Sequence, residues 1–326
     1  MTTIGGVDIA KDQVDVCLLL EDSQAQYETF PNSKGGLNKL HRWLKKQGAK
    51  TAPICLEATG IYGDLLAETL HQRGYTISVV NPARVKAYAD SQLRRNKTDK
   101  LDAALIADFC RTQVPVAWTP PSPERKELRA LLRHLDDLKQ EYQRVKNRLE
   151  AQRISQAVIG LLKQQQRFIE EQMAQTEHLI RDHIDQFPDL KHQRDLLTTI
   201  PGLGDITACR LMAELGDVRR FDNVREIVAY VGLNPRQHQS GKKRATQGIS
   251  RKGRASLRAA LYMPALVAIR HNPVLNAFAA RLQARALTAK QVIVAVMRKL
   301  LHLAYGILKS GQAFDPNYVQ KLANAA

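Results

Sequence analysis

Short apolar runs alternate with amphipathic stretches over the first 120 residues. The β-rich runs cover residues 4–20, 25–30, 52–57 and 75–80. The stretches with the three- and four-residue apolar spacing of helices cover residues 34–47, 62–73 and 99–111. Strands that alternate with helices predict an α/β domain with a mixed sheet over residues 1–120.

A proline-rich segment ends this pattern, since four of the nine residues 115–123 are proline. From Leu128 to Leu149, apolar residues recur at alternating spacings of three and four, which is the heptad pattern of a coiled coil. A weaker helical pattern runs from Val158 to residue 187. We therefore expect a helical hairpin over residues 121–187. It either packs only against its own chain or dimerises the protein, and the regular heptads favour dimerisation.

The last segment, residues 188–326, predicts helices joined by loops. Its helix candidates are residues 196–200, 206–215, 224–231, 256–270 and 290–308. No uninterrupted apolar run of about 18 residues predicts a membrane span, and the N-terminus has no secretion signal. The four cysteines form no CxxC pair, so we expect reduced thiols in a cytoplasmic protein.

The positive charge is concentrated in that last segment. The chain has a net charge of +17, yet residues 1–120 carry 15 basic and 13 acidic side chains, and residues 121–187 carry 12 and 11. Residues 188–326 carry 22 basic and 8 acidic ones, and residues 227–314 contain 15 Lys and Arg but no Asp or Glu. Such a stretch predicts a surface that binds the phosphates of a nucleic acid.

Four carboxylates of the first domain form a candidate metal site. Asp8 lies inside an apolar strand, where Asp is unusual, and Glu57 ends another strand. Asp99 and Asp102 share one face at the start of a helix, where a helix-dipole role is the alternative. Clustered carboxylates suit Mg²⁺, which assists phosphoryl transfer.

The segments that carry these acids resemble the DEDD-type insertion-sequence transposases. The similar segments are Gly6-Val7-Asp8-Ile9-Ala10-Lys11, Leu56-Glu57-Ala58-Thr59-Gly60 and Arg95-Asn96-Lys97-Thr98-Asp99-Lys100-Leu101-Asp102-Ala103. The resemblance implies an RNase H-like fold, similar to the RuvC Holliday-junction resolvase, in the first domain. It also implies that Asp8, Glu57, Asp99 and Asp102 bind the metal.

A Gly-rich turn lies between two predicted helices at Ile200-Pro201-Gly202-Leu203-Gly204. It looks like a helix-hairpin-helix motif, in which Gly202 and Gly204 let backbone N–H groups approach a DNA phosphate. An ordinary turn between helices, with a glycine cap, is the alternative.

A serine in a basic loop is the candidate nucleophile. Ser240 is followed by Gly241, and cations surround it. These and the next loop supply candidate phosphate contacts at Arg236, Lys242, Lys243, Arg244, Arg251, Lys252 and Arg254. The residues alone favour a turn that contacts phosphate. The transposase family, however, carries a catalytic serine in a similar Pro-x-x-x-x-Ser-Gly pattern, which Pro235 to Gly241 match. The resemblance therefore implies that Ser240 attacks DNA.

Other side chains near this loop leave the assignment open. His238 is a candidate proton acceptor, and Ser250 and Ser256 are alternative nucleophiles. The general base for Ser240 does not follow from the sequence.

The resemblance extends over the whole chain. Within that family, the chain is most similar to the bridge-RNA-guided recombinases. The resemblance implies a structured noncoding guide RNA that pairs with target and donor DNA. It also implies dimers that assemble into a tetramer, in which one protomer's acids act with another's serine. Two rival hypotheses remain: a metal-dependent nuclease of the Holliday-junction resolvase type, whose acids activate water, and a non-catalytic nucleic-acid scaffold dimerised by its heptads.

Overall fold

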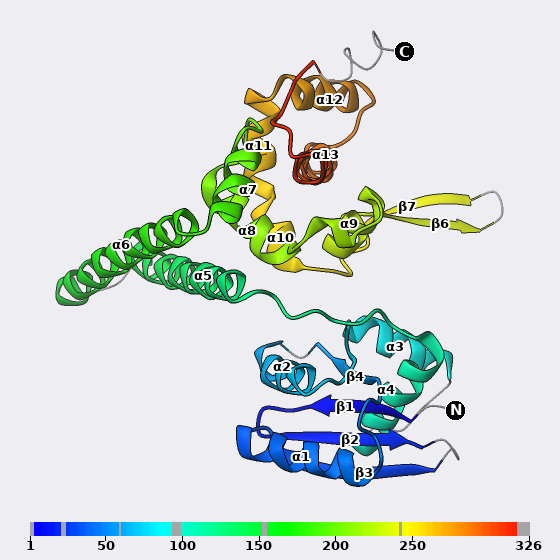
Figure 1. The fold of residues 1–326 in the computed structure, drawn as a ribbon. Helices are drawn as coiled ribbons and strands as arrows, with labels where there is room; N and C mark the ends of the chain where they lie inside the picture. The colour runs from blue at the N-terminus through cyan, green and yellow to red at the C-terminus, as the bar shows by residue number, and fades with distance from the viewer. Residues whose placement is uncertain are drawn as a thin grey trace. The chain divides into compact units, whose positions relative to one another are not determined.

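The computed structural model describes residues 3–20, 24–58, 60–92, 99–151, 155–240 and 243–317. Among these, the side chains of residues 61, 99, 237–240 and 243–247 are not described. The chain divides into two compact units, residues 1–120 and 121–326 (Figure 1). The division coincides with the proline-rich segment, and the helical hairpin belongs to the second unit.

A five-stranded mixed sheet forms the centre of the first unit. Its strands are β1 (Ile4–Ile9), β2 (Gln13–Leu19), β3 (Ala25–Pro31), β4 (Ile54–Glu57) and β5 (Ile77–Val80), in the order β3-β2-β1-β4-β5. The first three strands pair antiparallel, and β4 and β5 run parallel to β1. The predicted mixed sheet is therefore confirmed.

Helices cover both faces of this sheet. The core on one face joins the sheet to α1 (Lys34–Lys46) and α2 (Asp64–Gln72). The core on the other face joins it to α3 (Pro82–Ser91) and α4 (Asp99–Gln113). Helix α3 was not predicted from the sequence, because Val85 is its one buried residue and no apolar stripe marks it. Asn81 caps this helix by accepting a hydrogen bond from the Ala83 N–H.

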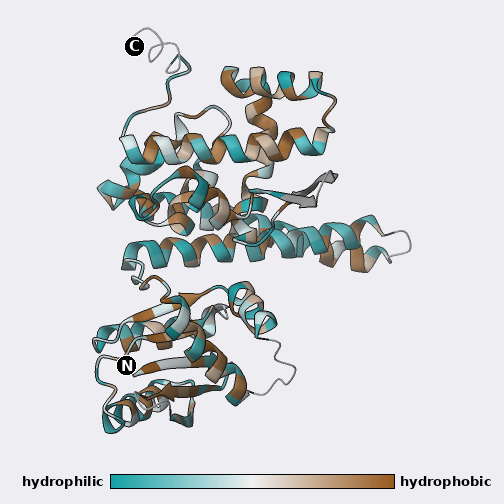
Figure 2. Cartoon of the chain, turned by 90° about the vertical axis from the view of Figure 1, so that its right-hand side faces the viewer, coloured by the Kyte–Doolittle hydropathy of each residue, from teal (hydrophilic) through white to brown (hydrophobic). Residues whose placement is uncertain are grey.

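The second unit begins with the predicted helical hairpin, made of α5 (Pro123–Glu150) and α6 (Gln156–Asp185). The heptad positions of α5 face α6 of the same chain, since Leu138 and Val145 are buried with Leu162 and Ile169. The outer surface of these long helices is mostly hydrophilic (Figure 2). The seam that favoured dimerisation is thus occupied within the chain.

The rest of the second unit is mainly helical, as predicted. Its helices are α7 (Pro188–Thr198), α8 (Asp205–Leu215), α9 (Val224–Val231), α10 (Ala255–Ala260), α11 (Tyr262–His271), α12 (Pro273–Ala284) and α13 (Ala289–Ser310). The single helix predicted over residues 256–270 is divided into α10 and α11, and α12 was not predicted. Asn272 caps α12 by accepting hydrogen bonds from the N–H groups of Val274 and Leu275.

Helix α13 is the core helix of this unit. Within the described part of the chain it is the one helix long and apolar enough to cross a membrane. Its apolar residues, among them Val296, Leu300 and Leu301, are nevertheless buried in the core of the unit. This burial accounts for its apolar composition, because a core helix needs the same residues as a membrane span.

The segment predicted as basic loops contains a β-hairpin. Strands β6 (Pro235–Ser240) and β7 (Lys243–Ile249) pair antiparallel and project from α9 as a two-stranded arm (Figure 1). The prediction of a loop at this point was wrong. The strands were missed because their residues are mostly polar and give no apolar alternation.

Candidate functional site

Acidic side chains form a row across the sheet, at the carboxyl ends of β1 and β4. Asp8 is paired with Asp15 on β2, and Asp15 with Thr29 on β3. On the other side, Val7 is paired with Leu56, so the next residues along these parallel strands, Asp8 and Glu57, are also neighbours. Paired residues point to the same face, and adjacent strands lie about 4.8 Å apart.

Helix α4 covers the face that carries this row. A Cβ on Gly6, two residues before Asp8, would lie 2.1 Å from the Ala107 nitrogen and 2.3 Å from the Ala103 oxygen. Any side chain at Gly6 would therefore push α4 off the sheet. A cavity of about 110 Å³ lined by Asp15, Thr29, Lys100 and Ala103, among others, shows that the first turn of α4 lies beside Asp15.

Asp8 and Glu57 thus lie on one face of the sheet, although the side chains that the structure describes do not form a closed metal site. Asp8, Glu57 and Asp102 are partly buried, and Asp8 accepts a hydrogen bond of 3.0 Å from the Ile9 N–H. The side chain of Asp99 lies outside the described residues. Among the side chains that are described, no three acids, histidines or cysteines lie close enough to hold one ion. The carboxylate oxygens themselves are the donor type that a hard divalent cation requires.

Asp15 is an acid of this row that the sequence analysis missed. It is 8% exposed and accepts hydrogen bonds from Thr29 Oγ1 (2.5 Å) and Gln13 Nε2 (3.2 Å). The signal that singled out Asp8, an aspartate inside an apolar strand, also applies to Asp15.

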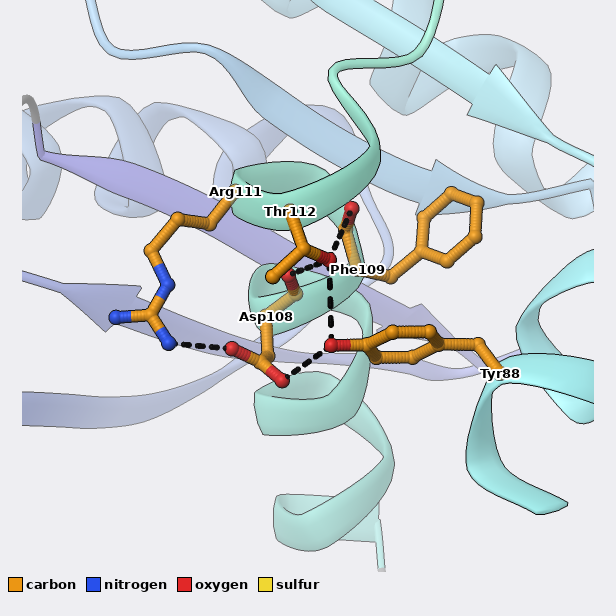
Figure 3. A network of polar contacts seen from close by, with 5 residues as sticks. All are labelled: Tyr88, Asp108, Phe109, Arg111 and Thr112. Atoms are coloured by element: carbon orange, nitrogen blue, oxygen red, sulfur yellow. Dashed lines mark hydrogen bonds and ion pairs between the residues drawn. The ribbon is translucent and has the colours of Figure 1, made fainter. Parts of the chain in front are cut away.

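A polar network fixes the far end of α4 (Figure 3). Asp108 accepts a 2.7 Å hydrogen bond from Tyr88 Oη on α3 and pairs with Arg111 at 2.6 Å. Thr112 Oγ1 donates to the Tyr88 oxygen at 3.2 Å. The network joins α3 to α4. The contacts of Asp108 are therefore structural and separate from the acid row.

All four cysteines are buried and free, which confirms the expectation of unpaired thiols. Cys55 lies two residues before Glu57, on the same face of β4. Its hydrogen bond with Cys110 of α4 and its burial raise the pKa of the Cys55 thiol. It therefore stays protonated and packs as a small apolar side chain.

The base of the β6–β7 arm is held tightly against α9. The Ser250 N–H donates to the Asn234 oxygen at 2.9 Å, and Ser250 Oγ donates to Asn234 Oδ1 at 2.5 Å. Gly253 packs so closely that a Cβ there would lie 2.3 Å from the Tyr230 oxygen. Arg258 donates to the Val231 oxygen at 2.8 Å, and burial, with the nearby Arg251 charge, lowers the pKa of Arg258.

The structure describes the backbone of the predicted nucleophile, Ser240, and the hydroxyl contacts of its two alternatives. Ser240 is the last residue of β6, and its register partner is Lys243. Its side chain and those of His238, Lys243 and Arg244 lie outside the described side chains, as does Lys242 altogether. The hydroxyl of Ser250 is engaged with Asn234, and that of Ser256 lies 3.4 Å from Glu214 Oε1.

The other predicted phosphate contacts divide by exposure. Arg236, Arg251, Lys252 and Arg254 are exposed around the base of the arm, so their charges are accessible to a polyanion. Gly202, in the turn between α7 and α8, has a φ of +102°, and a Cβ there would lie 2.6 Å from the Ala268 Cβ. Packing against α11 therefore accounts for this glycine.

Gly204 in the same turn is exposed, and a Cβ there would meet no described atom within 4 Å. The next residue, Asp205, places a carboxylate in the first turn of α8, which opposes the approach of a phosphate. The role of the turn in DNA binding stays a prediction.

Comparisons with known proteins assign both parts of the chain. A DEDD-type transposase family model matches residues 5–152, and the model described as "Transposase IS116/IS110/IS902 family" matches residues 194–280. The pilin gene-inverting protein of Moraxella bovis is 35% identical over 95% of this chain and 97% of its own length. The chain belongs to the IS110 family of transposases. It is an enzyme that acts on DNA in recombination and transposition.

Two further relatives are similar over most of the chain. The transposase of insertion sequence element IS1111A from Coxiella burnetii is 28% identical over 82% of this chain and 78% of its own length. The pilin gene-inverting protein of Moraxella lacunata is 34% identical over 95% of the chain.

Proposed function

We propose that this IS110-family transposase is an RNA-guided recombinase. In this proposal Ser240 is the nucleophile, and Asp8, Glu57, Asp99 and Asp102 hold Mg²⁺. The observation that carries it is the register of β1 and β4, which makes Asp8 and Glu57 neighbours beneath the start of α4. The helix that covers these two acids begins with the other two.

The first unit is proposed to have the RuvC-like variant of the RNase H fold. Its antiparallel β1–β2–β3 meander, continued by the parallel strands β4 and β5, fits that proposal. The acids lie towards the carboxyl ends of the parallel strands β1 and β4, where open α/β sheets bind their ligands.

The chemistry assigned to the chain is a transesterification. The Ser240 hydroxyl gives up its proton as its oxygen attacks a DNA phosphorus and forms a phosphoserine ester. The bond to the leaving sugar oxygen breaks and that oxygen takes up a proton, so no proton is gained or lost overall. A bound divalent cation would neutralise charge on the phosphate oxygens. The exposed cations at the base of the arm, Arg236, Arg251 and Lys252, bind phosphates of the same strand several nucleotides away from Ser240, which ends β6.

The same proposal names the partners of the enzyme. Target and donor DNA duplexes and a guide RNA require extended phosphate contact, which the acid-free residues 227–314 supply. The relatives named as gene-inverting proteins support an enzyme that rejoins the DNA it cuts. A cytoplasmic location is part of the proposal.

The proposal also includes a homodimer that pairs into a tetramer. Since α6 occupies the heptad seam of α5, we assign dimer contacts to the outer face of α6 instead. Leu161 and Phe168 are 66% and 61% exposed there, and Leu179 is 48% exposed. Their spacings of 7 and 11 residues place them on one stripe of the helix.

A substitution of Ser240 tests this proposal. Ser240→Ala should abolish covalent protein–DNA adducts and strand exchange, because no other hydroxyl replaces the attacking oxygen. DNA affinity should stay unchanged. The adduct is measured by denaturing gel electrophoresis after incubation with labelled DNA and Mg²⁺. Ser250→Ala is the matched control, since the Ser250 hydroxyl bonds Asn234. Metal-dependent cleavage that persists in Ser240→Ala would favour the nuclease in which the acids activate water.

A further inference from the structure

A cleft of about 220 Å³ lies in the second unit between α5, α8 and the start of α10. Four arginines and two carboxylates line it: Arg129, Arg133, Arg210, Arg254, Asp136 and Glu214. Pockets for drug-sized ligands typically measure about 300–1,000 Å³, so this cleft suits a smaller group. The excess of positive charge indicates that the group is an anion.

One arginine and one carboxylate neutralise each other in the wall of the cleft. Arg210 donates two hydrogen bonds of 2.5 Å to Asp136, in the bidentate geometry that fixes both side chains. Arg210 is only 8% exposed, so this pair joins α8 to α5. The remaining charges are three arginines and Glu214.

Of these three arginines, Arg254 pairs with Glu214, whereas Arg129 is incompletely satisfied. Arg129 Nη2 donates to the Ala213 oxygen at 2.7 Å, but its buried Nε has no hydrogen-bond partner within the described chain. Burial lowers the pKa of this guanidinium, with the charge of Arg254 acting in the same direction and Glu214 against it. Arg133 is exposed at the mouth. An anion in the cleft would compensate charges that the protein itself leaves unbalanced.

Arg254 connects the cleft to the base of the β6–β7 arm. It directly follows the turn Arg251-Lys252-Gly253, its N–H donates to the Tyr230 oxygen at 3.1 Å, and its Nη1 lies 3.5 Å from Glu214 Oε2. A strand that follows the exposed cations of that turn is therefore led to the mouth of the cleft.

We propose that this cleft binds one backbone phosphate of a nucleic-acid strand that passes the base of the arm. The inference rests on the proposed function only in that the enzyme binds nucleic acid. Arg133 and Arg254 contact the phosphate from the mouth and Arg129 from within, while Glu214 limits the affinity by repulsion. The contact positions the strand and reads no sequence.

The test compares equilibrium binding by full-length variants without divalent metal. The probes are a labelled mixed-sequence DNA duplex and an RNA strand of the same sequence, each titrated at several salt concentrations. Arg133→Gln should weaken binding about tenfold and reduce the salt slope by about one unit. The probe that shows this loss identifies the strand. Glu214→Gln should tighten binding several-fold, a direction that structural damage would not produce.

Arg144→Gln is the matched control, because Arg144 is exposed on α5 eleven residues beyond Arg133, on the same helical face. It should bind as the wild type does. Equal losses for Arg133→Gln and Arg144→Gln would mean diffuse charge and overturn the inference. It is also overturned if inorganic phosphate stabilises the wild type against heating more than Arg133→Gln, while both bind the probes equally. If the wild type binds neither probe, the proposed function fails as well.

Discussion

Two aspartates of α4 illustrate how the surroundings of a carboxylate decide its use. Asp108 accepts a hydrogen bond from Tyr88 and pairs with Arg111, so its charge is compensated within the protein (Figure 3). Asp102, six residues earlier, lies next to Ala103, whose oxygen touches Gly6 two residues before Asp8. The proposed metal site therefore includes the first turn of the helix, whereas the last turns have a structural role.

Replacing each aspartate by asparagine separates these roles. Asp102→Asn should abolish DNA cleavage and weaken Mg²⁺ binding, because it removes a charge from the proposed ligand set, and should leave thermal unfolding nearly unchanged. Asp108→Asn should keep cleavage and lose about 0.5–1 kcal/mol of stability with the Arg111 ion pair. Cleavage in the presence of Mg²⁺, calorimetric metal binding and thermal unfolding measure the three effects. Normal cleavage and metal affinity in Asp102→Asn would remove this residue from the site.

At the scale of elements, the sequence predicted what depends on apolar spacing. The strands that carry Asp8 and Glu57 are apolar and buried, so their pattern predicted both strands. The β6–β7 arm was missed because its pairing depends on backbone hydrogen bonds between polar residues. Asp15 was missed because the family resemblance rests on other residues, although its strand position carried the same signal as that of Asp8.

The heptad pattern also does not specify which helix packs against it. Apolar residues at alternating spacings of three and four need a second helix, and the pattern is the same whether that helix comes from the same chain or from another copy. The structure supplies α6 of the same chain. The exposed stripe on α6 was missed because Leu161, Phe168 and Leu179 are widely separated by polar residues.

Substitutions on the two faces of the hairpin distinguish these contacts. Leu161→Glu with Phe168→Glu should convert the proposed dimer into a folded monomer, because both side chains are exposed in the single chain. Leu135→Glu should instead destabilise the second unit by several kcal/mol, since it buries an unpaired carboxylate at a position that is 0% exposed. Sedimentation velocity and thermal unfolding measure the outcomes. An unchanged sedimentation profile in the α6 double variant would refute the assigned dimer face.

At the scale of the whole molecule, the two halves of the proposed chemistry belong to different compact units. The acids lie in residues 1–120 and Ser240 in residues 121–326. The boundary between the two units lies within the proline-rich residues 115–123. Such a composition is typical of a stiff linker. In the proposed mechanism, neither unit alone contains both the metal ligands and the nucleophile, so each proposed active site requires the two units to act on one DNA phosphate.

If the units that meet come from different protomers, two inactive variants should restore each other. Ser240→Ala contributes intact acids and Asp102→Asn contributes an intact serine. When the two variants associate at random in equal amounts, half of the dimers contain one copy of each. Such a mixed dimer holds one complete site when acids and serine come from different subunits. Strand exchange by the mixture should therefore reappear, measured on labelled DNA against each variant alone. When the units of one chain meet instead, every site in the mixture lacks one component and the mixture stays inactive. That result would leave the chemistry in place but assign each site to a single subunit.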